Sequence, residues 1–151
     1  MPTIEFTSQD EVIIELENAS GLMIDVSDSV GACRINVSNS VGRNAVFGRR
    51  LSPTTEGTST MSGSLTAYES IYTNSAHNIL MDWLVSDLTK KPGLRDITFY
   101  SPNQDIGSFR HDVSMRGTSY DLLSKTAGGD GTAPGHELSL EVHDYSYAII
   151  T

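Results

Sequence analysis

Cysteine and lysine are scarce in this chain, and each scarcity excludes a class of protein. Cys33 is the only cysteine among 151 residues, so a framework of intramolecular disulfides is excluded. Lysine occurs only at Lys90, Lys91 and Lys125, and the formal net charge is −9. A charge of this sign argues against ordinary nucleic-acid binding, which requires cationic side chains on the phosphates.

Long apolar runs and a leader-like start are also lacking. No hydrophobic run is long enough to span a membrane. The first residues, MPTIEFTSQDEV, have neither the basic region nor the apolar region of a secretory signal. We therefore expect a protein made in the cytoplasm with no membrane partner.

Aromatic residues make up only 7% of the chain, and its tyrosines are scattered along the sequence. A module that binds sugars or peptides would gather aromatic side chains on one face, so this class is disfavoured. A monomeric β-sandwich that binds a sugar or peptide stays an alternative function.

Patterns of catalytic residues are missing as well. The four histidines, His77, His111, His136 and His143, form no HxxxH or HExxH pattern, and no second cysteine is available to bind zinc. The glycine-rich AGGDGTAPG stretch lacks the GK[ST] ending of a phosphate-binding loop, and no GxSxG elbow is present. We expect no catalytic residue, no metal, no cofactor and no enzymatic activity.

Serine and threonine are abundant instead, and they concentrate in stretches that alternate like β-strands. In TTEGTSTMSGSLTAYESIY, which spans residues 54–72, Met61, Leu65 and Ala67 are predicted to face a core. The outward row is uncharged and consists of Thr60, Ser62, Ser64 and Thr66. A row of short hydroxyl side chains suits contact with a neighbouring subunit, so we interpret this segment as a subunit-interface strand.

The remaining pattern predicts one domain over residues 1–151 that is mainly β. We expect an antiparallel β-sandwich or barrel with one flanking α-helix at about residues 75–90 and a long loop, or an extended hairpin, at about residues 42–57. The helix should begin at a cap on Asn74 or Ser75 and bury a stripe that includes Trp83 and Leu88. Expected strands cover Glu11–Asn18, Leu22–Asp28, Ala32–Ser40, the stretch ending near Tyr68, Leu94–Pro102, Ser108–Gly117 and Glu137–Thr151.

The last expected strand changes its parity. Apolar residues occupy even positions from Leu138 to Val142 but odd positions from Tyr145 to Ile149. An extra residue that shifts the alternation is typical of a β-bulge, which we predict at His143–Asp144.

Charge is segregated in the first third of the chain. Residues 1–28 contain seven acidic residues and no basic one, whereas residues 29–55 contain four arginines and no acidic one. Complementary patches on one chain favour self-association, because each copy offers both halves of a contact.

These segments resemble a bacteriophage tail tube protein. The resemblance is carried by EGTSTMSGSLTAYES, the helix NILMDWLV, the strand GLRDITFYSP and the final strand ELSLEVHDYSYAIIT, and it covers roughly residues 42–151. The tube proteins of type VI secretion systems and of pyocins are related to the same family.

The resemblance implies a structural virion protein whose hexameric rings stack head to tail into a tail tube for genome delivery. The ring-stacking loop would comprise Arg43, Phe47, Arg49, Arg50 and Glu56. DNA would pass through an acidic lumen without specific binding, and the candidate lumen acids are Glu15, Glu17, Asp25 and Glu141. Other partners would be the tape measure, baseplate, terminator and possibly sheath proteins. The protein would be assembled in the host cytoplasm and reside in the virion tail.

Related ring-forming components fit the same features. A tail terminator or baseplate protein would form one ring and stop, and a type VI secretion tube protein would polymerise without carrying DNA. The sequence leaves these alternatives open.

Overall fold

A computed structural model describes residues 12–48, 50–51, 53–125, 127–128 and 134–151 of the chain. Strands dominate it, and helix α1 is the single α-helix in the described part. The elements in chain order are β1 (Ile13–Glu17), β2 (Met23–Asp25), the 3₁₀ turn η2 (Ser27–Ser29), β3 (Val30–Arg43), β4 (Thr54–Tyr68), α1 (Ala76–Val85), β5 (Arg95–Ser101), β6 (Phe109–Tyr120) and β7 (Gly135–Ile149). Helix α1 is too short to cross a membrane.

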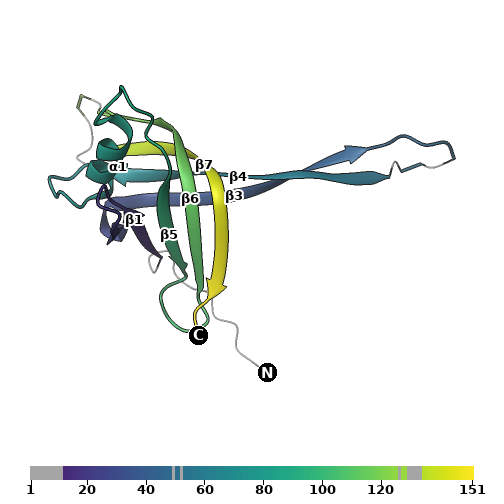
Figure 1. Ribbon diagram of the computed structural model, residues 1–151, viewed down its shortest axis with the longest axis horizontal. Coiled ribbons are helices and arrows are strands. Elements are labelled where there is room, and N and C mark those ends of the chain that lie inside the picture. The colour runs from purple at the N-terminus through teal and green to yellow at the C-terminus, as the bar shows by residue number, and fades with distance from the viewer. Residues whose placement is uncertain (1–11, 49, 52, 126, 129–133) are drawn as a thin grey trace.

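All seven strands belong to one antiparallel sheet, in the order β2-β1-β5-β6-β7-β4-β3 (Figure 1). The predicted mainly β, antiparallel architecture with one flanking helix is therefore confirmed. The expected closure into a barrel is not observed, because the edge strands β2 and β3 do not pair with each other in the described chain. Strand β2 has only three residues, whereas most of the long strand β3 projects away from the rest of the sheet. The two edge strands therefore do not lie side by side over a length that could form backbone hydrogen bonds.

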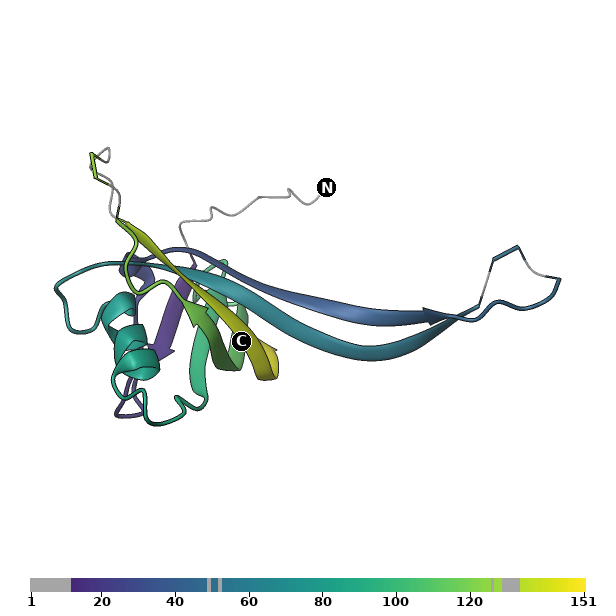
Figure 2. The ribbon, with the colours of Figure 1, turned by 90° about the horizontal axis from the view of Figure 1, so that it is seen from above.

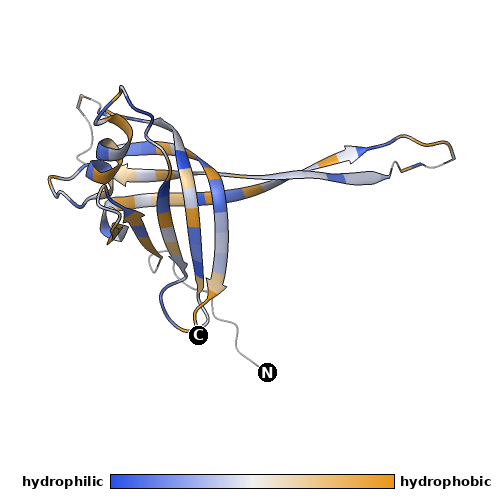
Figure 3. Cartoon of the chain, in the orientation of Figure 1, coloured by the Kyte–Doolittle hydropathy of each residue, from blue (hydrophilic) through white to orange (hydrophobic). Residues whose placement is uncertain are grey.

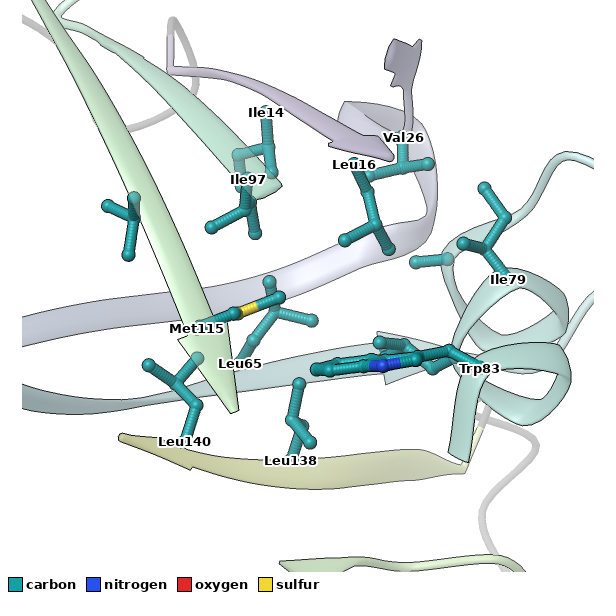
Figure 4. Close-up of a cluster of buried hydrophobic side chains, with 14 of the residues drawn as sticks. Ile14, Leu16, Val26, Leu65, Ile79, Trp83, Ile97, Met115, Leu138 and Leu140 are labelled. Carbon is teal, nitrogen blue, oxygen red and sulfur yellow. The ribbon is translucent and has the colours of Figure 1, made fainter. Parts of the chain in front are cut away.

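The sheet bends around a core because β7 pairs in two directions. Residues 135–141 pair with β4, for example Leu138 with Leu65, and residues 138–149 pair with β6. Strands β3 and β4 consequently cross β5 and β6 steeply (Figure 1). The buried apolar side chains of both layers and of α1 meet in the enclosed space (Figure 4). They are Ile14, Leu16, Val26, Leu65, Ala67, Ala76, Ile79, Leu80, Trp83, Ile97, Phe99, Val113, Met115, Leu138 and Leu140.

The predicted bulge in β7 is confirmed. Ser114 pairs with Asp144 and Met115 pairs with Val142, so His143 is the extra residue that opposes nothing. Val113 and Met115 are both buried. Their pairing partners in β7, on either side of the bulge, therefore lie on the inner face of the sheet.

Helix α1 begins as predicted but ends earlier. The Ser75 side chain caps it by accepting a hydrogen bond from the Asn78 amide. The last helical residue is Val85, and the Asp87 carboxylate then accepts a hydrogen bond from the Thr89 amide at 3.0 Å. This side-chain turn competes with helical bonding. The prediction that Leu88 belongs to the buried stripe is wrong, because Leu88 is 80% exposed.

Candidate assembly surfaces

Strands β3 and β4 leave the body together as a long two-stranded hairpin (Figures 1 and 2). Only Ser62–Tyr68 of β4 also pairs with β7, so the outer part of β4 pairs with β3 alone. Of the two expectations for residues 42–57, the structure has the extended hairpin, since Arg43 still pairs with Thr54 and Val41 with Glu56. β-branched residues close to the tip favour extended pairing over a loop.

The tip of the hairpin carries apolar and basic side chains. Phe47 is fully exposed, Leu51 is 79% exposed, and Val46 is also exposed. The apolar tip stands out at the end of the otherwise pale hairpin in Figure 3. Arg43 and Arg50 are exposed too, and neither takes part in a salt bridge within the described chain.

Two further members of the predicted stacking loop have different outcomes. Glu56 lies on β4 rather than in a loop, and it is exposed. Arg49 lies outside the described residues.

The predicted alternation in β4 is confirmed at its core end. Leu65 and Ala67 are buried and Met61 is half-buried, whereas Thr60 is exposed. The outward residues Ser62, Ser64 and Thr66 are half-buried. Whether this row contacts a neighbouring subunit stays a prediction.

The four predicted lumen acids share the outer face of the sheet. Glu15 and Asp25 are direct cross-strand partners, and Glu17 follows two residues after Glu15 on the same side of β1. Glu141 lies between the buried Leu140 and the inward-facing Val142, so it points outward from β7. The sheet places these four carboxylates on one face, but β5 and β6 separate Glu141 from β1, and Glu141 lies opposite Arg116 of β6.

Three more acids on this face were missed by the sequence reasoning. Asp96, Asp112 and Asp144 line one hollow on the outer face with Thr98 and Arg110. Strict alternation in the segments around Ile97 and Val113 could have identified the first two. Asp144 required the position of the bulge as well.

Hydrogen bonds fix several of these groups. The Glu17 carboxylate accepts from the Asp96 amide at 3.0 Å, and the Asp112 carboxylate accepts from the Thr98 hydroxyl at 3.0 Å. Arg110 donates from Nε to Asp112 at 3.1 Å, and this hydrogen bond raises the pKa of Arg110. Only part of the negative charge on the face is offset in this way.

The acidic face and the hydroxyl row of β4 are continuous. Ser62 pairs directly with Glu141, and Ser64 pairs with Ser139. Directly opposed side chains lie on the same face about 5 Å apart. The predicted lumen surface and the predicted subunit-interface strand therefore meet at Ser62 and Glu141, and any boundary between them passes there.

The inner face carries an aromatic cluster that the sequence reasoning missed. His111 stacks on Tyr145 with ring centroids 5.9 Å apart and on Phe109 at 6.0 Å, and Tyr147 lies 6.1 Å from Phe109. The His111 ring nitrogen Nδ1 lies 2.6 Å from the Tyr145 hydroxyl. Tyr145 and Tyr147 are therefore not scattered in space. The bulge at His143 turns both side chains to the inner face, where they lie beside β6.

An open groove of about 590 Å³ lies between this cluster and the hairpin. Its lining is mostly apolar and comes from β3, β4, β5, β6 and β7, and it includes Cys33, His111 and Tyr145. Residues Ile35, Val37 and Met61 form the hairpin wall. This groove continues the inner face of the sheet beyond the core.

The histidines form no metal site in the described part of the chain, where no group of three or more potential ligands lies close enough to hold an ion. His77 and His136 are buried between α1 and the start of β7. His77 Nδ1 lies 2.5 Å from the Tyr120 hydroxyl, and His136 Nδ1 lies 2.7 Å from the Asp121 carbonyl oxygen. These contacts join α1 to β6 and β7.

Comparison with known proteins identifies the fold. No family model matches the sequence, and no curated protein matches it. Among solved structures, the tube-terminating cap of the anti-feeding prophage has a TM-score of 0.67 and 10% identity, covering 99% of this chain and 95% of that chain. The SPP1 tail tube has a TM-score of 0.63 and 12% identity over 96% of this chain and 81% of that chain.

A third solved structure, the tail of an empty gene transfer agent particle refined with C6 symmetry, has a TM-score of 0.63 and 12% identity. It covers 97% of this chain and 100% of that chain. At such identities the likeness shows the fold alone. The predicted resemblance to tail tube proteins is thus confirmed at the level of fold.

Proposed function

We propose that this chain is the structural subunit of a phage-like tail tube. Copies form hexameric rings, and the rings stack head to tail into a conduit for DNA. The observation that carries the proposal is the projecting hairpin. Its outer strands pair only with each other, and its apolar side chains are exposed to solvent. The shared fold with tail tube and cap proteins supports the same assignment.

The hairpin needs a neighbour for physical reasons. An isolated two-stranded ribbon is only marginally stable in water. Val37 and Val41 on β3 are both more than half exposed, and the tip adds Phe47 and Leu51. A stretch of this kind gains stability when another copy covers it. Since the hairpin projects to one side, the contact is heterologous and repeats from copy to copy.

The acidic outer face supports the conduit. Carboxylates at Glu15, Glu17, Asp25 and Glu141, joined by those from β5, β6 and β7, repel phosphate. DNA would slide past such a wall without specific binding.

The remaining parts of the proposal concern partners and location. The protein would reside in the virion tail after assembly in the host cytoplasm. It would contact a tape measure protein inside the tube, baseplate and terminator proteins at its ends, and a sheath if the tail is contractile.

A tube-terminating cap is the second candidate, because the cap of the anti-feeding prophage shares the fold over nearly the whole chain. A cap forms one ring and does not stack. A baseplate ring follows the same reasoning, whereas a type VI secretion tube would stack.

Electron microscopy of the purified chain over a concentration series, with light scattering on the same samples, tests the proposal. Hollow tubes built from stacked rings are the expected result. Closed rings that never stack would favour the cap, and a monomer at every concentration would count against both assignments.

A further inference from the structure

The open side of the sheet carries two neighbouring hollows. One is the groove of about 590 Å³, and the other, of about 500 Å³, lies between β1 and the start of β3. Val12 and Cys33 line both of them. Because β3 pairs only with β4 in the described chain, the hollows follow the line along which the sheet fails to close into a barrel. We call this line, which runs from Val30 to Val37 of β3 and faces Val12, the seam.

The seam is largely apolar and open to water. In β3, Cys33, Ile35 and Val37 follow one another at every second position and share one face of the strand. Cys33 is exposed and Val37 is 57% exposed. Covering apolar surface stabilises a fold by roughly 25 cal/mol per Å² removed from water. A segment with apolar side chains would therefore gain free energy by lying in the seam.

The chain joins the fold at the wall of the seam. Val12 precedes β1, and residues 1–11, which lie outside the described residues, precede Val12 directly. In the register of β1 on β5, Ile13 pairs with Tyr100, so residue 11 would stand opposite Pro102. Proline has no N–H to donate to a ladder. The pairing of β1 with β5 therefore has no continuation before Val12.

Residues 1–11 have the sequence MPTIEFTSQDE, which contains the pattern of a short strand with one apolar side. Ile4 and Phe6 are separated by Glu5 and flanked by threonines. Threonine, isoleucine and phenylalanine all favour extended backbone. The pattern provides two large apolar side chains on one face of an extended segment.

The length of the segment matches the groove. Phe6 is six residues from Val12, so an extended chain carries it up to about 20 Å from that wall. The β3 wall from Cys33 to Val37 is about 13 Å long, at the usual rise per residue of a strand. Attachment at Val12 also gives a short tether an effective concentration on the order of a millimolar. A second copy would have to reach that concentration in solution to compete.

We infer that residues 1–11 dock in the seam of their own copy, beside β3, with Ile4 and Phe6 in the groove. Strand β3 is an edge strand, so one row of its backbone groups has no strand partner in the described chain and is available to an added strand. The groove ends at Val37, so Val41 and the tip of the hairpin stay open to another copy. The inference is therefore independent of the proposed tube.

Cys33 reports directly on the seam, because its thiol is the only one in the chain and lines both hollows. The docked segment should shield it from iodoacetamide. Ile4→Glu with Phe6→Glu should release the segment and raise the rate of alkylation at least tenfold. Thr3→Glu with Thr7→Glu adds the same charge at the alternate positions and should leave alkylation slow. All rates are measured at a concentration at which sedimentation shows a monomer.

The opposite wall gives a second pair of variants. Val37→Glu places a charge in the groove and should raise the alkylation rate as well. Val41→Glu is the matched control, since Val41 is 58% exposed on the same strand but does not line the groove. Urea unfolding supplies a readout that does not depend on the thiol. Its midpoint should fall in the Ile4 and Phe6 double variant and stay unchanged in the threonine double variant.

Each outcome decides the inference. Equally fast alkylation in the unmodified chain and in the Ile4 and Phe6 double variant overturns it. Equally slow alkylation in both also overturns it, because something other than these side chains would then cover Cys33. Shielding that appears only as the protein concentration rises would assign the seam to a second copy instead. Since the rates are those of the monomer, they stand whether or not the chain forms tubes.

Discussion

The rings of His77 and His136 lie 4.1 Å apart inside the protein. Because the Asp121 carbonyl can only accept, His136 Nδ1 donates to it, and Nε2 of the neutral ring carries no hydrogen. That buried Nε2 has no hydrogen-bond partner in the described chain and lies 4.0 Å from the Glu69 carboxylate. The Glu69 carboxylate is therefore the charged group that faces this nitrogen, and the His77 ring packs against the same imidazole.

Acid should destabilise the fold through this pair. Burial and the neighbouring His136 lower the pKa of His77 below its usual 6.5, so the unfolded chain binds the proton more readily. The stability that neutral His77 provides is complete above about pH 6.5. It is lost as the pH falls through that value towards the folded-state pKa. Thermal melting of the monomer should show a Tm that falls between pH 7.5 and pH 5.5.

Two variants test whether His77 causes this fall of Tm with pH. H77Q should flatten the dependence of Tm on pH, whereas H143Q should leave it unchanged because His143 is exposed on the bulge. An unchanged slope in H77Q would show that other groups set the acid response.

Leu138→Ala should lower the free energy of unfolding by about 2–5 kcal/mol. Leu138 is fully buried beside Leu65 and Trp83 in the core (Figure 4). Leu88→Ala removes the same atoms from an exposed site and should change stability by less than about 0.5 kcal/mol. Urea unfolding of both variants measures the difference, and equal losses would contradict the early end of α1.

Gly63→Ala should destabilise the root of the hairpin by about 1–3 kcal/mol. A Cβ at Gly63 would lie 2.1 Å from the Arg34 carbonyl oxygen, which belongs to the backbone of the paired strand. Gly42→Ala is the control, because a Cβ there would meet the Thr55 hydroxyl, which can rotate away. Equal unfolding midpoints in urea would show that β3 shifts freely at Arg34.

Thr60→Lys with Ser64→Lys should prevent assembly while the monomer stays folded. Two charges on the uncharged row would be buried if a neighbour covers it, and unpaired buried charge is costly. Sedimentation measures assembly, and circular dichroism checks the fold. Tubes of normal appearance would show that the row faces open space, as its neighbour Glu141 is proposed to do.

Glu15→Lys with Asp25→Lys should make assembled tubes retain DNA in a salt-sensitive manner. These cross-strand partners lie at the β2 edge of the proposed lumen face. Asp82→Lys with Asp105→Lys makes the same change of charge on α1 and on the β5–β6 connection, and should not retain DNA. Loss of assembly in the first variant would instead place Glu15 and Asp25 in a subunit interface.

The sequence predicted features that depend on neighbours along the chain. Alternation located the buried residues of β4, the parity change located the bulge at His143, and the Ser75 cap located the start of α1. Each is a short-range signal, in which the chain itself carries the period or the capping group.

Features that depend on which strands pair were not predictable in the same way. Alternation gives the face of a strand but not its partner, so the cluster of Phe109, His111 and Tyr147 emerged only from the register of β6 on β7. The choice between a long loop and an extended hairpin at residues 42–57 stayed open for the same reason. The end of α1 depended on a local competitor, the Asp87 turn, which a helical stripe does not reveal.

If the chain forms the proposed tube, the projecting hairpin also has a kinetic consequence. A hairpin that contacts a single neighbouring copy buries little surface and binds weakly. A complete ring lets an incoming copy contact several subunits at once, so binding there is tighter. Elongation from an existing ring is then much faster than nucleation of a new ring. Polymerisation should show a lag that pre-formed rings abolish, so the number of tubes is set by whatever supplies the first ring.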